Sequence, residues 1–220
     1  MRLMHPILQS PIDFDGKVVS RILLENKLCY FNCTKEILTQ SLIDEGEYVL
    51  SQKNEILTMS KNVKVIYDFY DLQPNKKELG ELLKYLVTKA NQELGLELKE
   101  VCLDLISKFD ILLANENQGV FINEFDFVDL LKLLKIQVRF SDNSLREMLL
   151  DYAQFLFEYC EIKLIVICGI SEFIDKDEYK QLSDNLRGKN INTLFIESKA
   201  SDFDCNISTI IIDDDLCLIK

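Results

Sequence analysis

The sequence predicts an α/β fold in which a strand-rich head is split in two along the chain and a helical segment is inserted between its halves. Three observations predict it. Strand-like runs rich in β-branched and aromatic residues stand near both ends of the chain, a helical spacing of apolar residues begins at Pro74, and the strand pattern resumes near Lys163. The predicted domains are therefore a head formed by residues 1–73 and 161–220 and a helical leg at 74–160.

The segment on which the head is predicted to depend is the run 163–169, KLIVICG. Its unbroken apolar core is typical of a central parallel strand that is covered on both faces. A helical pattern at 176–186 and a second apolar run at 193–196 follow, which predicts a β-α-β unit. Ligands of open parallel sheets sit at the carboxyl ends of such strands, so the loop 169–173 is the first place to look for a binding site.

The first part of the head is predicted to contain strands with one helix among them. The expected elements are a strand at 18–26, a helix from Thr34 to Gly46, and strands at 47–51 and 63–70 joined by a turn near Lys53 and Asn54. A last strand is expected within 208–218. Because the leg interrupts the head, the strand at 163–169 must pair with a strand from before residue 74.

The leg is predicted to be entirely helical. Asn75 and Glu78 have the spacing of a capping box, and an apolar stripe runs from there to Leu94. Further helices are expected at 98–113, in a shorter stretch that follows 115–123 and ends near Leu134, and at 144–160. These stripes predict a helical layer and carry no information about ligands.

The composition is that of an ordered chain without a membrane segment. Of 220 residues, 48% are hydrophobic and 28% are charged, with 7 Gly and 3 Pro. No apolar run approaches the roughly 20 residues of a membrane helix, and the N-terminus lacks the pattern of a secretory signal, so a cytoplasmic location is expected. The seven Cys are odd in number and scattered, which favours reduced interior residues over a disulfide framework.

The net charge of −12 argues against passive binding of nucleic acid, because a phosphate backbone attracts a basic surface. The charges are distributed unevenly, however. Lys132, Lys135 and Arg139 fall within a stretch that has no acid, whereas 202–215 holds five Asp and no cation. Solvated faces are the ordinary interpretation of both runs, and the three cations are the candidates for contact with DNA.

Known catalytic constellations are missing from the sequence. His5 is the single histidine, so any Ser-His-Asp or Cys-His arrangement would have to use it. Cys29 and Cys33 have no second Cys or His pair nearby to complete a zinc site, and Cys168 is interpreted as a small buried hydrophobe. Neither a phosphate-binding loop nor a Gly-x-Gly-x-x-Gly motif occurs. These absences leave no candidate catalytic residue among the known motifs and weaken every hypothesis of nucleotide hydrolysis.

Two stretches nevertheless resemble metal chemistry. The first is the apolar run 209–212 followed by Asp213, Asp214 and Asp215, the form in which nucleotide hydrolases and two-metal nucleases present carboxylates to magnesium. A strand end in a solvated turn is the simpler interpretation. The alternative function is a metal-dependent phosphohydrolase or nuclease that uses these three residues.

The second stretch is 116–129, which is rich in carboxylates and side-chain amides. Hard oxygen ligands of this kind suit calcium, although the pattern of an EF-hand is absent. Glu124 and Asp126 would equally favour the dipole of a following helix, so the chemistry of the residues leaves both interpretations open.

Five groups of residues also match a known family in order and spacing. They are MRLMHP with PIDFD at the start of the chain, GEYVLS at 46–51, KNV at 61–63, FVDLLKLL at 127–134 and IIDDDLCLI at 211–219. Together they resemble the CRISPR-associated Csn family of type II-A adaptation proteins, over nearly the whole chain. No single motif is diagnostic, and the match depends on all of them.

The resemblance implies a head derived from the P-loop nucleotide-hydrolase fold that has lost its phosphate loop, with an inserted helical leg. It also implies a non-catalytic protein whose four copies form a ring that binds calcium between head and leg. The ring would hold the ends of linear double-stranded DNA and act in spacer acquisition with the CRISPR integrase and effector nuclease. An acidic protein can bind DNA if cations gather on one surface and calcium neutralises nearby acids.

The residues that this resemblance selects lie in and beside the acidic stretch. The family's calcium region leads into a helix whose Leu-Leu-Lys is matched at 130–132, which implies Glu116, Glu124, Asp126 and Asp129 as calcium ligands. Gly119, Phe121 and Asn123 stand where carboxylates are common in the family. The resemblance thereby moves the expected function from the loop 169–173 to the interior of the ring and the junction of head and leg.

Overall fold

A computed structural model describes residues 1–15, 18–114, 134–198 and 207–219 of the chain. The chain divides into two compact units. The larger unit consists of Met1–Gln73 with Phe140–Lys220, and the smaller unit is Pro74–Arg139. The two parts of the larger unit are thus brought together across an inserted segment.

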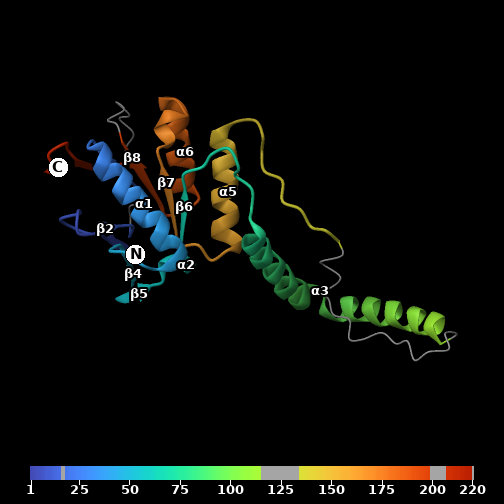
Figure 1. The fold of residues 1–220 in the computed structure, drawn as a ribbon. Helices are drawn as coiled ribbons and strands as arrows, with labels where there is room; N and C mark the ends of the chain where they lie inside the picture. The colour runs from blue at the N-terminus through green and yellow to red at the C-terminus, as the bar shows by residue number, and fades with distance from the viewer. Residues whose placement is uncertain (16–17, 115–133, 199–206, 220) are drawn as a thin grey trace. The chain divides into compact units, whose positions relative to one another are not determined.

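The centre of the larger unit is a six-stranded sheet in the order β10-β9-β3-β8-β7-β6. Figure 1 labels three strands of this sheet, β6, β7 and β8. Its strands are β3 (Val19–Leu24), β6 (Val63–Ile66), β7 (Leu164–Cys168), β8 (Thr193–Glu197), β9 (Ser208–Ile212) and β10 (Leu218–Ile219). All neighbouring strands are parallel except β10, which is antiparallel to β9. The α/β class predicted from the sequence is confirmed.

Strand β7 is the predicted run 163–169, and all five of its residues are buried. It pairs in parallel with β6, with Val63 opposite Leu164 and Ile66 opposite Ile167. The expected pairing across the insertion therefore exists. The predicted central position does not, because β7 lies next to the edge strand β6 while β3 and β8 occupy the middle.

Strand β7 is buried because other elements cover both of its faces. Its apolar run therefore does not reveal which strands lie beside it or how near it is to the edge of the sheet. Leu164, Val166 and Cys168 belong to a core shared with helix α1, whereas Ile165 and Ile167 point to the opposite face, as alternate residues of a strand do. Helix α6 (Lys176–Gly188) contacts β3 and helix α5 (Leu145–Tyr159) contacts α6. A covered strand is apolar whatever its rank in the sheet.

A second sheet of four antiparallel strands has the order β2-β1-β4-β5. Its strands are β1 (Arg2–Met4), β2 (Ile12–Asp13), β4 (Val49–Gln52) and β5 (Glu55–Leu57). Lys53 and Asn54 both have positive φ, 50° and 67°, as a two-residue hairpin turn requires. The predicted turn is therefore present, but it leads to β5 and not to the strand beginning at Val63, which lies beyond the short helix α2 (Met59–Asn62) in the other sheet.

Helix α1 (Lys27–Ile43) begins seven residues before the predicted start at Thr34. Asn26 is its N-cap, and the Asn26 side chain accepts a hydrogen bond from the Cys29 amide at 3.0 Å. The buried side of the helix is formed by Cys29, Cys33, Ile37 and Gln40. In the turns before Thr34 only Cys29 and Cys33 contribute to this face, so these turns lack the apolar periodicity that indicates a helix.

Helix α3 (Lys76–Leu113) is one element of 38 residues where two were predicted. The capping box is confirmed: the Asn75 side chain accepts from the Glu78 amide, and the Glu78 carboxylate accepts from the Asn75 amide at 2.9 Å. The predicted break lay near Gly95. A single glycine costs a helix only about 1 kcal/mol, and no proline follows to end it.

Helix α5 was predicted within the leg, 74–160, and it belongs to the larger unit. Its N-cap is Ser144, and its apolar face, which includes Leu149, Tyr152 and Leu156, is buried. The helix predicted after 115–123 lies outside the described residues. Among the helices that the structure describes, none combines the length and apolar composition needed to cross a membrane.

Candidate functional site

The parallel strands of the larger unit bring chemically different residues together at their carboxyl ends. Asn26 follows β3, Asp213 follows β9, Gly169 follows β7, Tyr67 follows β6, and Glu197 ends β8. The carboxyl ends of parallel strands are where ligands bind in open α/β sheets. This edge is therefore the region in which the described residues offer a candidate site.

At the start of α1 the chain leaves no room for a phosphate loop. Only Glu25 and Asn26 separate β3 from α1. The Glu25 amide donates to the Ile212 carbonyl at 3.0 Å, and the Asn26 side-chain amide donates to the Asp214 carbonyl at 3.1 Å. Because the Asn26 side chain also accepts from the Cys29 amide, one of the amides at the helix start that could meet a phosphate is already held by the protein's own chain.

The three aspartates 213–215 form the turn between β9 and β10. The Asp213 Oδ1 atom accepts a hydrogen bond from the Cys217 amide at 2.7 Å, and the Asp213 amide donates to the Cys217 carbonyl at 3.0 Å. Leu216 has φ 62°, in the left-handed region. The Asp213 carboxylate thus closes a hairpin turn, which agrees with the simpler interpretation of this stretch.

A pocket of about 480 Å³ lies at the ends of β6, β7 and β8. Aromatic rings make up much of its wall, and they come from Tyr30, Phe31, Tyr67, Phe69 and Phe173. Cys168, Gly169, Glu172, Lys35 and Ser198 also line it. The loop 169–173, which the strand pattern predicts as a binding region, therefore lies at a pocket. The family resemblance instead predicts function in the interior of the ring and at the junction of head and leg.

Gly169 is required at the base of this pocket by its conformation and by its neighbour. Its φ is 73°, a value that side-chain-bearing residues rarely adopt, and a Cβ atom there would lie 2.8 Å from the Tyr30 Oη atom. Its amide donates to the Ile196 carbonyl at 2.9 Å. The absence of a side chain at Gly169 thereby allows the Tyr30 ring to lie against the base of the pocket and form part of its wall.

Glu197 is buried beside the pocket, with 1% of its surface exposed. Its Oε2 atom accepts hydrogen bonds from the Ser171 hydroxyl at 2.7 Å and from the Ser171 amide at 3.4 Å. Within the described residues its Oε1 atom has no hydrogen-bond partner. Burial raises the pKa of Glu197 to about 7 against the lowering effect of Ser171. Sequence reasoning did not select Glu197, although a carboxylate that ends an apolar strand was a signal for it.

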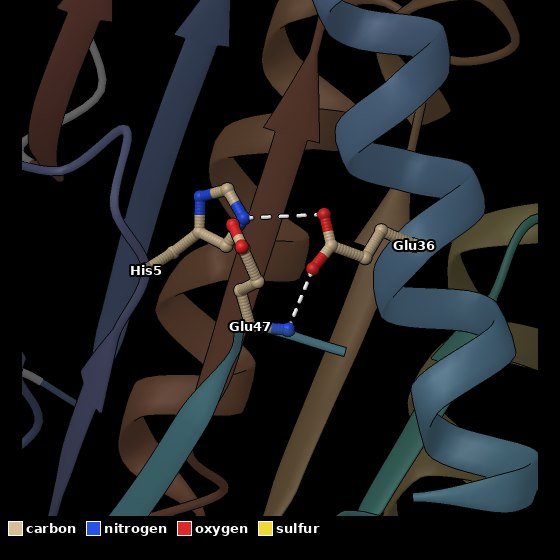
Figure 2. A group of neighbouring side chains, drawn as sticks. All are labelled: His5, Glu36 and Glu47. Atoms are coloured by element: carbon tan, nitrogen blue, oxygen red, sulfur yellow. Dashed lines mark hydrogen bonds and ion pairs between the residues drawn. The ribbon is translucent and has the colours of Figure 1, made fainter. Parts of the chain in front are cut away.

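A separate group in the larger unit joins His5, Glu36 and Glu47 (Figure 2). Atoms that these three side chains could offer to a metal lie within 4.8 Å of one another. His5 Nε2 lies 3.2 Å from Glu36 Oε2, and the Glu47 amide donates to Glu36 Oε1 at 2.7 Å. The buried imidazole stacks on Tyr48, with 4.2 Å between ring centroids.

The hydrogen bonds of His5 do not fit a metal ligand. The Ile7 amide donates to His5 Nδ1 at 3.3 Å, so the proton of the neutral ring belongs on Nε2, where it is donated to Glu36. A metal on Nε2 would displace that proton to Nδ1, where it would face the Ile7 N–H. Histidine ligands usually donate from their second nitrogen. The group therefore links three chain segments. The partners of the two ring nitrogens are Glu36 and the Ile7 amide, so among the described residues His5 forms no Ser-His or Cys-His pair.

Most of the predicted site residues lie outside the part of the chain that the structure describes. This applies to the calcium candidates Glu116, Glu124, Asp126 and Asp129 and to the DNA candidate Lys132. Lys135 and Arg139 are exposed in the irregular segment 134–139 of the smaller unit, where Lys135 has φ 49°. The calcium site and the grouping of the three cations stay predictions.

No protein-family model and no curated protein matches this chain. Among solved structures, the crystal structure of Stu0660 of Streptococcus thermophilus is similar, with a TM-score of 0.57 and 17% sequence identity. The similarity covers 97% of this chain and 75% of that chain. At this identity the likeness concerns the fold.

Proposed function

We propose that this protein is a non-catalytic, sequence-independent binder of double-stranded DNA ends that acts in CRISPR spacer acquisition as a calcium-assisted homotetrameric ring. The proposal is supported by a similarity in sequence and a similarity in fold, each of which extends over nearly the whole chain. The sequence resemblance to the Csn family spans nearly the whole chain, and the fold is similar over 97% of the chain to that of Stu0660 of Streptococcus thermophilus.

The geometry of the strand ends supports the non-catalytic part of the proposal. The start of α1 is capped by Asn26, and the Asp213 carboxylate is engaged in its own turn. A nucleotide hydrolase of this topology would need a free helix start for phosphate and free carboxylates for magnesium. These two contacts therefore favour a binding protein over the alternative phosphohydrolase or nuclease.

Charge explains why the proposal includes a cation. Duplex DNA carries one negative charge per roughly 1.7 Å of its axis, and the protein has a net charge of −12. Association then requires a local basic surface, for which Lys132, Lys135 and Arg139 are proposed. It also requires neutralised acids, for which calcium held by Glu116, Glu124, Asp126 and Asp129 is proposed.

The proposed partners and cellular location are also those that the family resemblance implies. The proposed partners are further copies of the chain, linear DNA, and the CRISPR integrase and effector nuclease, and the proposed location is the cytoplasm. Assembly can be examined separately from DNA binding. Sedimentation of the pure protein should give the mass of four copies in calcium and a smaller species in chelator.

A binding experiment with two forms of one DNA tests the central claim. Linear duplex and a covalently closed circle of the same sequence are incubated with the protein in calcium or in chelator, at rising salt. We expect retention of the linear form in calcium, no cleavage, and a steep loss with salt. Equal retention of the circle would contradict end binding. Magnesium-dependent degradation that disappears in Asp213→Ala would instead support the alternative enzyme.

A matched pair of variants tests the proposed DNA contacts. Lys135→Ala with Arg139→Ala should weaken retention of all sequences equally and reduce the slope of affinity against salt by about two phosphate contacts. The control is Lys176→Ala with Lys180→Ala, which removes two exposed cations from α6. An equal loss in both pairs would show that only net charge matters.

A further inference from the structure

The pocket at the ends of β6, β7 and β8 has no part in the proposed function. We propose that this pocket binds an organic cation, an ammonium or guanidinium group carried on a small apolar body. Three features support it: the aromatic wall, the acid Glu172 in the lining, and a cation that already lies over one of the rings. It is independent of DNA binding.

The wall of the pocket presents ring faces and edges from three segments. Tyr30 and Phe31 belong to α1, Tyr67 and Phe69 follow β6, and Phe173 follows β7. Phe69 and Phe173 meet edge to face, with 5.1 Å between centroids. Phe31, Tyr67 and Phe173 are 58%, 59% and 50% exposed. Rings gathered in this way offer a negative face to a cation and an apolar surface to its body.

One ring of this wall already shows the interaction that we propose. The Lys35 ammonium lies 5.8 Å from the centroid of the Phe31 ring. Of the described residues that line the pocket, Lys35 is the one cation, and it is itself exposed. Its side chain is flexible, so an incoming cation can displace it from the ring. Removing Lys35 should therefore improve the site for another cation.

The acids favour a cation over an anion in the rest of the pocket. Glu172 lines the pocket, and Glu197 is buried next to the lining residue Ser198, with one carboxylate oxygen unpartnered among the described residues. Glu172 is the acid among the described residues that line the pocket, and its side chain is exposed to an incoming ligand. Its carboxylate would attract a cation and repel an anion at this place.

The size of the pocket limits the ligand. Its volume of about 480 Å³ lies within the usual range of roughly 300–1,000 Å³ for small-molecule sites. This accommodates a free amine of modest size or a single arginine or lysine side chain. Both sources share one chemistry, and the experiment below separates them.

Three probes of one shape test the charge preference. Choline is cationic, 3,3-dimethyl-1-butanol is its neutral counterpart, and 3,3-dimethylbutanoate is anionic. Titration of each into the full-length protein, followed by ligand-observed NMR, should show choline binding roughly tenfold more tightly than the neutral alcohol, with the anion weakest. Equal affinity for the three, or preference for the anion, would overturn the proposal.

Charge variants locate the binding. Glu172→Gln should weaken choline binding several-fold and Lys35→Gln should strengthen it, whereas the control Asp177→Asn, an exposed acid outside the pocket, should leave it unchanged. Circular dichroism verifies that each variant is folded. The opposite signs for Glu172 and Lys35 are not expected of a general folding defect, and their reversal would indicate an anion site.

The final arm identifies the source of the cation. Agmatine and a capped tripeptide with a central arginine carry the same guanidinium. Tighter binding of agmatine points to a free amine, and tighter binding of the tripeptide points to a basic side chain of a polypeptide. Failure of both, with choline also unbound, would contradict the proposed site without affecting the proposed DNA binding.

Discussion

The imidazole of His5 donates from Nε2 to Glu36 Oε2 across 3.2 Å, while its Nδ1 accepts from the Ile7 amide. The single histidine of the chain thereby connects the turn after β1 to α1. Glu36 in turn accepts from the Glu47 amide just before β4. His5 therefore joins two segments of the chain. The group of His5, Glu36 and Glu47 is either a structural link or a metal site, and the two roles predict different effects of mutation.

Replacement of His5 by Ala should lower the free energy of unfolding by about 1–3 kcal/mol, because it removes a buried stacking partner of Tyr48 and leaves Glu36 Oε2 without its donor. Urea unfolding of the two proteins measures the difference. The matched control is Glu47→Gln, which keeps the backbone amide that Glu36 uses and changes only an exposed carboxylate.

If the group held a divalent metal, Glu47→Gln would weaken the protein as His5→Ala does, and added zinc or manganese would raise Tm. We expect the control to differ from the parent protein by less than about 0.5 kcal/mol and the metals to have no effect on Tm. Either positive result would restore the metal interpretation.

The buried carboxyl of Glu197 should make stability depend on pH. Its pKa is raised from 4.5 to about 7 in the folded protein by burial. Between these values the folded state holds a proton that the unfolded state has lost, so stability is fully present below pH 4.5 and falls as pH rises to about 7. The shift corresponds to about 3 kcal/mol.

Glu197→Gln should remove this loss, since the amide keeps the shape and does not titrate. Denaturant unfolding at pH 5 and pH 8 measures the change in each protein. A parent and variant with parallel pH profiles would show that Glu197 is ionised in the folded state over the whole range.

Gly169→Ala should destabilise the larger unit by about 2 kcal/mol, because φ 73° is strained for alanine and the new methyl group meets Tyr30 Oη. Tyr30→Phe in the same background should recover part of the loss by removing that oxygen. Urea unfolding of the single and double variants completes a double-mutant cycle.

Gly188 provides the control for this substitution. It lies in α6, and a Cβ added there meets no atom within 4 Å. Gly188→Ala should therefore leave stability unchanged or raise it slightly. A loss at Gly188 as large as that at Gly169 would contradict the assignment of strain and contact to the pocket glycine.

The turn after β9 predicts different results for two replacements of Asp213. Asp213→Asn retains an oxygen that can accept from the Cys217 amide, so stability should change little, whereas Asp213→Ala should cost about 1 kcal/mol. Thermal unfolding measures both. Equal Tm values for the two variants would show that the carboxylate does not hold the turn.

Local signals in the sequence were sufficient for several elements. The capping box of Asn75 and Glu78 starts α3 as predicted, because its two hydrogen bonds join residues three apart. Helix α6 and strands β7 and β8 lie where the apolar patterns placed them. In each case the physical cause lies within a few residues of the element itself.

The pocket and the His5 group could not be predicted in this way. Tyr30 and Gly169 are 139 residues apart in the chain, and they meet because α1 packs on the face of the sheet that carries Leu164, Val166 and Cys168 of β7. The same holds for His5 and Glu36, which no spacing rule connects. Contacts between distant segments depend on strand order, which the apolar run of β7 did not reveal.

The sequence by itself determined the α/β class, the interruption of the head by helices, and the absence of a phosphate loop, because composition, periodicity and motif are local properties. The tertiary structure decided the rest: the place of β7 beside the edge strand, the capped start of α1, the pocket at the strand ends, and the proton on His5 Nε2. These are set by which residues meet in space, and a buried carboxylate such as Glu197 takes its chemistry from those neighbours.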